Sequence, residues 1–336
     1  MGQPESERVS LGKRLFINRD YGLLLLGRLV SQIGDGIHYF ILTWLVLDLT
    51  GSGTTLGTLL MASSLPGILL SPFAGVIVDT VSRKLIIVGA DIIRGLLILA
   101  LAGFYHFGQL TMPVLYVATV LLSLCGVVFG PAISASIPNL VKKEELVQAN
   151  ARDSFSMSAT GILGPIMGAA ILGALGYFWV FIVTGIAFIL SAISEMFIRF
   201  PKTVPATSPQ ADKGGSGTKP VSPVGQFVTN FKQGVAYIWA NTGLRTVVVF
   251  ALVLNFMANP LFSVVFPYFA KEVLLMEASH YGVTQSSFPA GLMLGTLLVG
   301  MLSQKIGKHR LFSWGIIGQG LLVLLMSLVA FPGIYQ

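Results

Sequence analysis

Long apolar runs separated by short polar segments make up most of this chain. A run of about 20 apolar residues with few charges is typical of a transmembrane helix, because a helix of that length crosses the hydrocarbon layer. Helices are expected because every backbone N–H and C=O in lipid needs a partner within its own segment. The pattern therefore predicts an all-α integral membrane protein. We predict about nine spans, at residues 22–47, 54–78, 85–104, 112–138, 154–175, 177–199, 244–270, 283–303 and 311–331.

One long polar interruption lies between the sixth and seventh predicted spans. Residues 203–223 are rich in Pro, Ser, Gly and Lys and have little to bury, which predicts a flexible linker. The apolar positions that follow have helical spacing and predict an amphipathic helix on the membrane surface. These positions are Phe227, Phe231, Val235 and Ile238. We therefore expect a six-helix N-terminal half over 1–200, a cytoplasmic linker with an amphipathic helix over 201–243, and a partial C-terminal half of three helices over 244–336.

Composition and charge agree with a membrane location. The chain is 54% hydrophobic and 10% charged, whereas soluble proteins carry about 25% charged residues. The net charge of +7 raises the possibility of nucleic-acid binding. However, nearly all Lys and Arg residues fall in the N-terminal segment and in the loops after spans 2, 4, 6 and 8, and Lys271 alone lies on the other side. The positive-inside rule then predicts a multi-pass protein of the cell membrane with a cytoplasmic N-terminus, and no nucleic-acid partner.

Polar residues inside the first span are costly in lipid and therefore indicate function. They fall within about 120° of one helix face at 100° per residue. The candidates are Arg28, Gln32, Asp35, His38 and Tyr39. We expect this stripe to line a cavity. The alternative is that Arg28 and Asp35 pair with neighbouring helices. Asp35 is the best candidate for proton coupling because a partly desolvated carboxylate binds a proton more readily. His38 could act similarly, or be a hydrogen-bonded structural residue.

Two further sets of intramembrane charges carry predictions. Asp91 and Arg94 are spaced i, i+3 near the end of span 3, which predicts an ion pair on one helix. Glu195 lies about one turn from the end of span 6. Its simplest interpretation is a side chain that extends toward water at the membrane surface.

A loop pattern occurs twice, after span 2 and after span 8. The first copy contains Gly75, Asp79, Arg83 and Lys84, and the second contains Gly300, Gln304, Lys305, Gly307 and Lys308. Repetition of this kind predicts two related halves. Gly75 permits close approach of a helix, and Asp79 can meet the positive N-terminal end of an opposing helix. We expect the first copy, with Asp91 and Arg94, to form a cytoplasmic gate. Alternatively, its basic residues only set the topology.

The fifth span contains Gly164, Pro165 and Gly168, which predict a kinked helix with a smooth face, or a tight packing seam. No enzymatic motif accompanies these features. The sequence has no Cys/His cluster with metal-ligand spacing, no Walker A sequence and no Gly-x-Ser-x-Gly elbow. We therefore expect no enzyme activity, metal, cofactor or nucleotide, and any transport must use an ion gradient or the substrate's own gradient.

These motifs resemble those of the major facilitator superfamily, and within it the drug:H⁺ antiporters that include macrolide-efflux-like exporters. Gly75, Asp79, Arg83 and Lys84 match the signature between helices 2 and 3, and the second copy matches the loop between helices 8 and 9, with Gln304 at the acidic position. Gly164-Pro165-x-x-Gly168 is similar to the antiporter motif of helix 5. The segment from Phe129 to Asn150 is similar to the macrolide-efflux-like group.

The resemblance implies a bundle of two six-helix halves, of which helices 10 to 12 are missing here. It implies a secondary transporter that exports small amphipathic molecules or drugs by proton antiport and alternating access, with substrate, protons and membrane lipid as partners. In the family, the aspartate that corresponds to Asp79 faces helix 11. Two alternatives stay open. The chain could be a truncated, non-transporting membrane protein or interaction partner, or an exporter or flippase of a siderophore or lysophospholipid.

Overall fold

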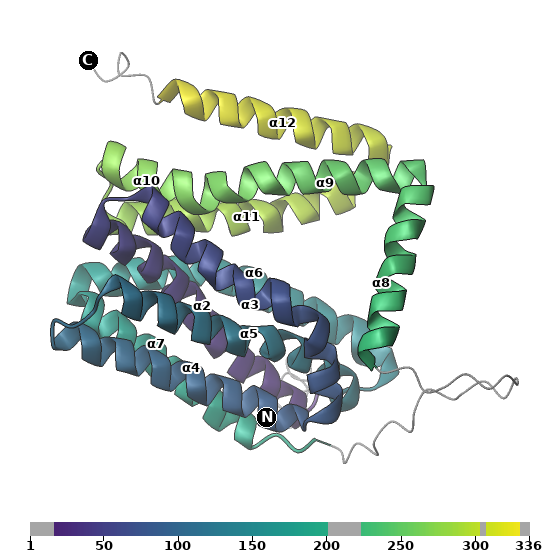
Figure 1. Cartoon of the computed structure of the whole chain (residues 1–336), viewed down its shortest axis with the longest axis horizontal. Helices are drawn as coiled ribbons and strands as arrows, with labels where there is room; N and C mark the ends of the chain where they lie inside the picture. Colours follow the sequence, from purple (N-terminus) through teal and green to yellow (C-terminus); the bar gives the residue numbers. More distant parts are fainter. Residues whose placement is uncertain (1–16, 201–222, 303–306, 330–336) are drawn as a thin grey trace, which may run out of the picture. The chain divides into compact units, whose positions relative to one another are not determined.

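The computed structural model describes residues 17–200, 223–302 and 307–329, and the regular elements within these ranges are helices (Figure 1). Each of the first six predicted spans corresponds to one long helix. A short 3₁₀ turn, η1 (Lys143–Glu145), precedes the fifth of them. The six helices are α2 (Arg19–Thr50), α3 (Gly53–Thr80), α4 (Arg83–His106), α5 (Met112–Leu140), α6 (Leu146–Leu175) and α7 (Tyr177–Met196).

The remaining helices follow the rest of the predicted pattern. They are α8 (Pro223–Ala240), α9 (Thr242–Pro260), the π-helix η2 (Leu261–Val265), α10 (Phe266–Tyr268), the π-helix η3 (Phe269–Val273), α11 (Ala278–Leu302) and α12 (Lys308–Val329). Pro260 and Pro267 lie at the changes between α and π geometry, where a missing backbone N–H is accommodated. The predicted amphipathic segment is helical in α8. Residues 201–222 of the predicted linker lie outside the described residues.

Polar side chains set the starts of several helices. Asn18 accepts a hydrogen bond from the backbone N–H of Tyr21 at 2.8 Å at the start of α2. Ser52 and Ser82 do the same for α3 and α4, each at 3.2 Å. These side chains satisfy N–H groups that have no partner within the first turn of a helix. The chain can therefore reverse direction in short turns between consecutive helices.

Fewer helices of the described ranges have the length and hydropathy of a membrane span than the sequence pattern predicts. Within the described residues, six helical segments are long and apolar enough to cross a membrane. They are α3, α4, α5, η1 with α6, α7, and the continuous stretch Thr242–Val273. The helix α2 has 32 residues, but its polar side chains make it less apolar. The count of about nine spans therefore stays a prediction.

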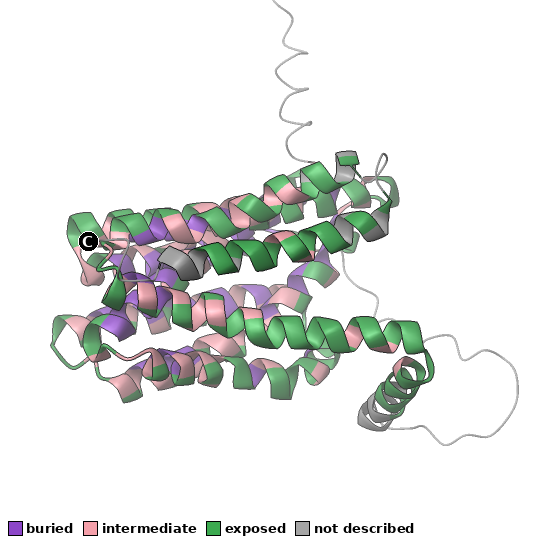
Figure 2. Cartoon of the chain, turned by 90° about the horizontal axis from the view of Figure 1, so that it is seen from above, coloured by how far each residue is buried: buried purple, intermediate pink, exposed green. Residues whose placement is uncertain are grey.

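The chain divides into two units, residues 1–286 and 287–336, and the interactions considered below lie within the first. In that unit α2 packs against α6 and α7, α4 packs against α5 and α7, and α3 packs against α5. Figure 2 shows that the buried residues occupy the helix faces that turn toward neighbouring helices. Large apolar side chains such as Ile68, Leu69 and Leu96 remain exposed on the outer faces, as expected for helices that contact lipid.

Candidate functional site

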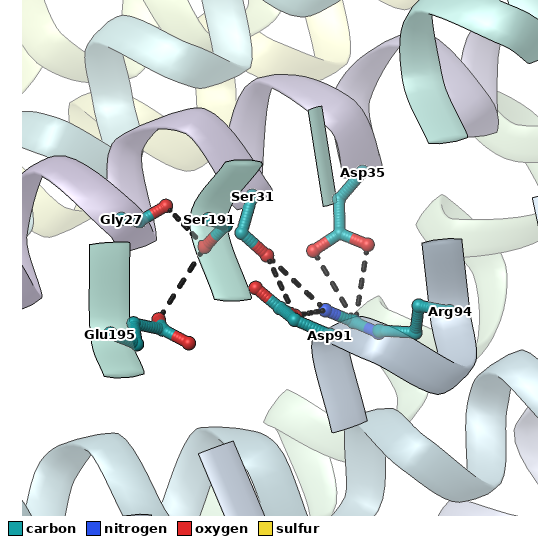
Figure 3. Close-up of polar contacts among 7 residues, drawn as sticks. All are labelled: Gly27, Ser31, Asp35, Asp91, Arg94, Ser191 and Glu195. Atoms are coloured by element: carbon teal, nitrogen blue, oxygen red, sulfur yellow. Dashed lines mark hydrogen bonds and ion pairs between the residues drawn. The ribbon is translucent and has the colours of Figure 1, made fainter. Parts of the chain in front are cut away.

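A buried guanidinium joins α2 and α4 (Figure 3). Arg94 Nη2 lies 3.1 Å from Asp35 Oδ1 in α2, and Arg94 Nη1 lies 3.4 Å from Asp91 Oδ1 in α4. The Ser31 hydroxyl, also in α2, donates to Asp91 Oδ1 at 3.2 Å. The ion pair predicted from the i, i+3 spacing of Asp91 and Arg94 is therefore present, and Asp35 extends it to a second helix.

The three charged groups differ in how accessible they are. The side chain of Asp91 is 0% exposed and that of Arg94 is 9% exposed, whereas that of Asp35 is 47% exposed. Phe129 and Phe188 lie against the guanidinium of Arg94, with their ring centroids 5.0 and 5.1 Å from Cζ. Aromatic faces attract such a cation and shield it from water. Asp35 is therefore the carboxylate that a molecule or proton outside the bundle reaches first.

Glu195 of α7 points into the bundle, and the interpretation that it extends toward water is wrong. The residue is 1% exposed and packs against α2, so closely that a Cβ on Gly27 would lie 3.0 Å from its Cγ. The Ser191 hydroxyl lies 2.7 Å from the carbonyl oxygen of Gly27 and 3.5 Å from Glu195 Oε1. Its position on the packed face of α7, rather than on an outer one, keeps this carboxyl from water.

Two polar residues of α2 connect it to α6 instead of α4. Arg28 forms an ion pair with Asp153, and both side chains are largely buried. Gln32 Oε1 accepts hydrogen bonds from the hydroxyls of Ser156 at 3.1 Å and Thr160 at 3.4 Å. The predicted polar stripe is thus divided between two neighbouring helices, which is the alternative given above for Arg28. The lining of a cavity by this stripe stays a prediction.

His38 and Tyr39 complete the candidates in α2. His38 lies three residues beyond Asp35 and therefore shares its side of the helix. Its Nδ1 is buried and has no hydrogen-bond partner among the described residues. Tyr39 is 39% exposed. The two side chains lie close to the accessible carboxylate, and their role in proton coupling stays a prediction.

In the first copy of the loop pattern, the basic residues hold neighbouring helix ends. Arg83 Nη1 donates to the carbonyl of Ala135 in α5 at 2.9 Å. Lys84 Nζ donates to the carbonyls of Met196 and Ile198 at 2.6 and 2.9 Å, where α7 ends. A cation at the C-terminal end of a helix is favourable because the last carbonyls are unpaired and the helix dipole is negative there. Both residues therefore stabilise the packing of this end of the bundle.

The other two residues of this copy lie on an open helix face. Gly75 and Asp79 are exposed in α3, and a Cβ placed on Gly75 would meet no atom within 4 Å among the described residues. A gate formed by this face with another helix stays a prediction.

The second copy is only partly described. Gly300 lies in the last turn of α11, Gly307 precedes α12 and Lys308 begins it. Gln304 and Lys305 lie outside the described residues. The copy is thus located between two helices, as its pattern predicts.

The glycine motif in α6 forms a tight seam with α2. A Cβ on Gly164 would lie 2.7 Å from the Cα of Gly36, and a Cβ on Gly168 would lie 3.0 Å from Cδ1 of Phe40. Neither distance leaves room for a side chain. The predicted packing seam is therefore present, and it brings the backbones of α2 and α6 into direct contact beside Asp35.

The same part of α6 also contacts the start of α11. A Cβ on Gly282 would lie 2.8 Å from the carbonyl oxygen of Pro165. The Ser286 hydroxyl, which is buried, lies 2.8 Å from the carbonyl oxygen of Ile162. Pro165 therefore lies where α6 meets both α2 and α11.

A second polar group lies at the far end of α2. Asp48, in its last turn, forms an ion pair with Lys271 of η3 and accepts a hydrogen bond from the hydroxyl of Tyr177. Lys271 Nζ also donates to the carbonyl of Trp44 at 2.9 Å and lies 4.7 Å from its ring centroid. The Trp44 ring stacks on Tyr281 of α11 at 5.1 Å. Charge and aromatic packing thus close this end between α2, η3 and α11.

Residues 24–335 match the model of the Major Facilitator Superfamily. The chain belongs to this superfamily of membrane transporters. It is 24% identical to Macrolide efflux protein A of Streptococcus pyogenes over 313 residues, which cover 92% of this chain and 73% of that protein. It is 25% identical to the multidrug efflux pump Tap of Mycolicibacterium fortuitum over 320 residues, again 92% of this chain and 73% of that protein.

Comparison with a solved structure supports the fold of this chain. A bacterial homologue of the human lysosomal transporter Spinster, in an inward-facing and unoccupied conformation, superimposes with a TM-score of 0.61 and 18% sequence identity. The match covers 87% of this chain and 64% of that structure. The predicted all-α membrane bundle and the resemblance to the superfamily are therefore confirmed.

Sequence reasoning misinterpreted Glu195 and missed Asp153 and Asp48. The burial of Glu195 could have been inferred, because it continues a series spaced 4, 3 and 4 that places it on one helix face with Thr184, Phe188 and Ser191. Asp153 likewise continues a polar series in α6. Asp48 carries no such signal, since its pairing with Lys271 depends on how distant helices pack.

Proposed function

We propose that this chain exports small amphipathic molecules, including drugs, in exchange for protons. Membership of a transporter superfamily supports the class of activity. The relatives named for macrolide and multidrug efflux support export of drugs. The observation that carries the proposal is the accessible carboxylate of Asp35, held by the buried Arg94 across the α2–α4 contact. Protons, substrate and membrane lipid are the expected partners, with no nucleotide or nucleic acid.

Proton binding at Asp35 changes the force between two helices. The ionised carboxylate attracts Arg94 at 3.1 Å, and water weakens this attraction only from the Asp35 side, because the side chain of Arg94 is 9% exposed. A proton on Asp35 removes that attraction, while Arg94 keeps its contact with Asp91 in its own helix. The α2–α4 contact is therefore weakened without leaving Arg94 unpaired. A substrate that binds better to one arrangement of these helices becomes coupled to the proton through this difference.

Alternating access requires that one end of the bundle be closed while the other is open. The contacts of Asp48 with Lys271 and Tyr177 close one end of α2. We assign that end to the outer side of the cell membrane, with the N-terminus in the cytoplasm, on the basis of the Lys and Arg distribution. The loop with Asp79, Arg83 and Lys84 then lies on the cytoplasmic side. There it closes the bundle when the outer side is open.

Accumulation of labelled erythromycin and of ethidium in cells that lack their own efflux pumps tests this function. We expect cells with the chain to accumulate less of at least one compound, and a protonophore to remove the difference. Asp35→Asn, which cannot ionise, should slow export by about tenfold or more, the size of a typical coupling free energy. Glu144→Gln is the control, because Glu144 is exposed in η1. If Asp35→Asn exports as the wild type does, the proton site is elsewhere.

The same assay separates the alternatives. Equal accumulation with and without the chain would favour a membrane protein that does not transport. A siderophore or lysophospholipid as the cargo would be recognised by a thermal-shift panel on the purified protein. In that panel the true substrate raises the melting temperature because it binds only the folded state.

A further inference from the structure

The carboxyl groups around Arg94 outnumber the cations. Asp35 of α2 and Asp91 of α4 contact one guanidinium, and Glu195 of α7 lies beyond Asp91, next to Ser191 (Figure 3). If all three carboxyls were ionised, the cluster would carry an excess of two negative charges within the bundle. Such an excess is strongly unfavourable away from water. At least one carboxyl must therefore hold a proton.

The contacts indicate which carboxyl this is. Asp35 and Asp91 each lie within ion-pair distance of Arg94. Glu195 has no such contact with a cation among the described residues, and the Ser191 hydroxyl lies 3.5 Å from its Oε1. Two other cations of the surrounding helices make contacts elsewhere. Arg28 pairs with Asp153, and Lys84 donates to the carbonyls at the end of α7.

Unpaired oxygen atoms support the same assignment. Glu195 Oε2 and Asp91 Oδ2 are buried and have no hydrogen-bond partner among the described residues. In Figure 3 the free oxygen of Glu195 points toward the side of the cluster where Asp91 lies. A protonated Glu195 can donate a hydrogen bond, and an ionised Asp91 can accept it. One proton thus lowers the excess from two negative charges to one and provides the donor that these atoms lack.

We propose that Glu195 is a second proton-binding site, separate from Asp35, and that Asp91, Ser31 and Ser191 connect the two sites. The two sites lie on opposite sides of Asp91, one at the accessible carboxylate in α2 and one close to the end of α7 held by Lys84. Loss of a proton at one site adds a negative charge to the cluster, and that charge favours proton binding at the other site. The role in coupling rests on the proposed function, but the binding of a proton at Glu195 does not.

Infrared difference spectroscopy tests this proposal on the purified full chain reconstituted in phospholipid vesicles, without substrate. A protonated carboxyl gives a separate C=O stretching band that shifts in heavy water. We expect the wild type to show this band at neutral pH, and Glu195→Gln to lose it. Glu144→Gln should retain it, and so should Asp35→Asn. An unchanged band in Glu195→Gln would overturn the assignment, whether or not the protein transports drugs.

Two further measurements keep the result decisive. Ser191→Ala removes the hydroxyl beside Glu195 and should shift the band without removing it, so an unshifted band would contradict the site even if Glu195→Gln failed to fold. Replacing choline chloride by sodium chloride at constant pH tests the other possible occupant. Loss of the wild-type band in sodium would show that a metal cation, rather than a proton, neutralises the cluster.

Discussion

Two charged clusters on α2 are constructed differently. The Arg94 cluster consists of Asp35, Asp91, Arg94 and Glu195, and the Lys271 cluster consists of Trp44, Asp48, Tyr177 and Lys271. In the Arg94 cluster carboxyls outnumber cations, and most side chains are buried. In the Lys271 cluster one carboxylate meets one ammonium, and the side chain of Asp48 is 41% exposed. A cluster with excess charge is stabilised by a bound proton, whereas a balanced pair only needs to stay in contact.

The two clusters share a helix but join it to different partners. Asp35 and Asp48 are separated by about 20 Å along α2 at 1.5 Å per residue. Asp35 contacts α4, and Asp48 contacts η3 and α7. Movement of α2 toward one set of partners therefore affects the other. Under the proposed function, the middle of α2 responds to protons and its last turn closes one end of the bundle.

The largest effect is expected for Arg94→Ala, which leaves Asp35 and Asp91 without their cation. Removing one partner of a buried ion pair typically costs about 3–5 kcal/mol. The free energy of unfolding in mixed micelles, followed by circular dichroism, measures this cost. Lys142→Ala, at an exposed site, is the control and should change little. Wild-type stability of Arg94→Ala would mean that the carboxyls are already neutral and that the cluster carries no charge excess.

An intermediate effect is expected for Gly164→Val, at the contact between α6 and α2. A Cβ there would lie 2.7 Å from the Cα of Gly36, so the helices must separate, at about 1–3 kcal/mol. Gly173→Ala in the same helix is the matched control, because no atom lies within 4 Å of the added Cβ. Thermal unfolding compares the two variants. If both behave alike, the seam does not constrain α2 and the two clusters are not linked through it.

The smallest effect is expected at the Lys271 cluster. A double-mutant cycle of Asp48→Asn and Lys271→Met should give a coupling free energy of about 1 kcal/mol, since the half-exposed Asp48 is screened by water. The cycle is measured by thermal unfolding at two pH values at which the pair remains charged. A coupling that varies strongly between them would show that this end also responds to protons, which would remove the distinction between the clusters.

The sequence predicts the helices well because their apolar runs are long, and their ends coincide with local signals such as Ser52 and Ser82. It also predicts contacts within one helix, such as Asp91 with Arg94, because the helical spacing fixes them. Contacts between helices were harder to infer. The partners of Arg28 and Asp48 come from α6 and η3, and nothing in the local sequence specifies which helices become neighbours.

The burial of Glu195 depends on which face of α7 carries it, not on its distance from the helix end. A position near a helix end favours extension toward water only if the residue faces lipid. The periodicity of α7 instead places Glu195 on the packed face beside Ser191. Periodicity over several turns is therefore the better guide than distance from the helix end when an acidic residue lies near the membrane surface.

The contact between Gly36 and Gly164 has a mechanical consequence. Because backbone meets backbone there, no side chain has to change rotamer when the helices tilt against each other. We expect such a contact to act as a fulcrum, located close to Asp35 and about 18 Å along α2 from Asp48 at 1.5 Å per residue. A small tilt near Asp35 would then become a larger displacement near Asp48. The chain would need no flexible loop to open that side, only a rigid lever and a change of charge.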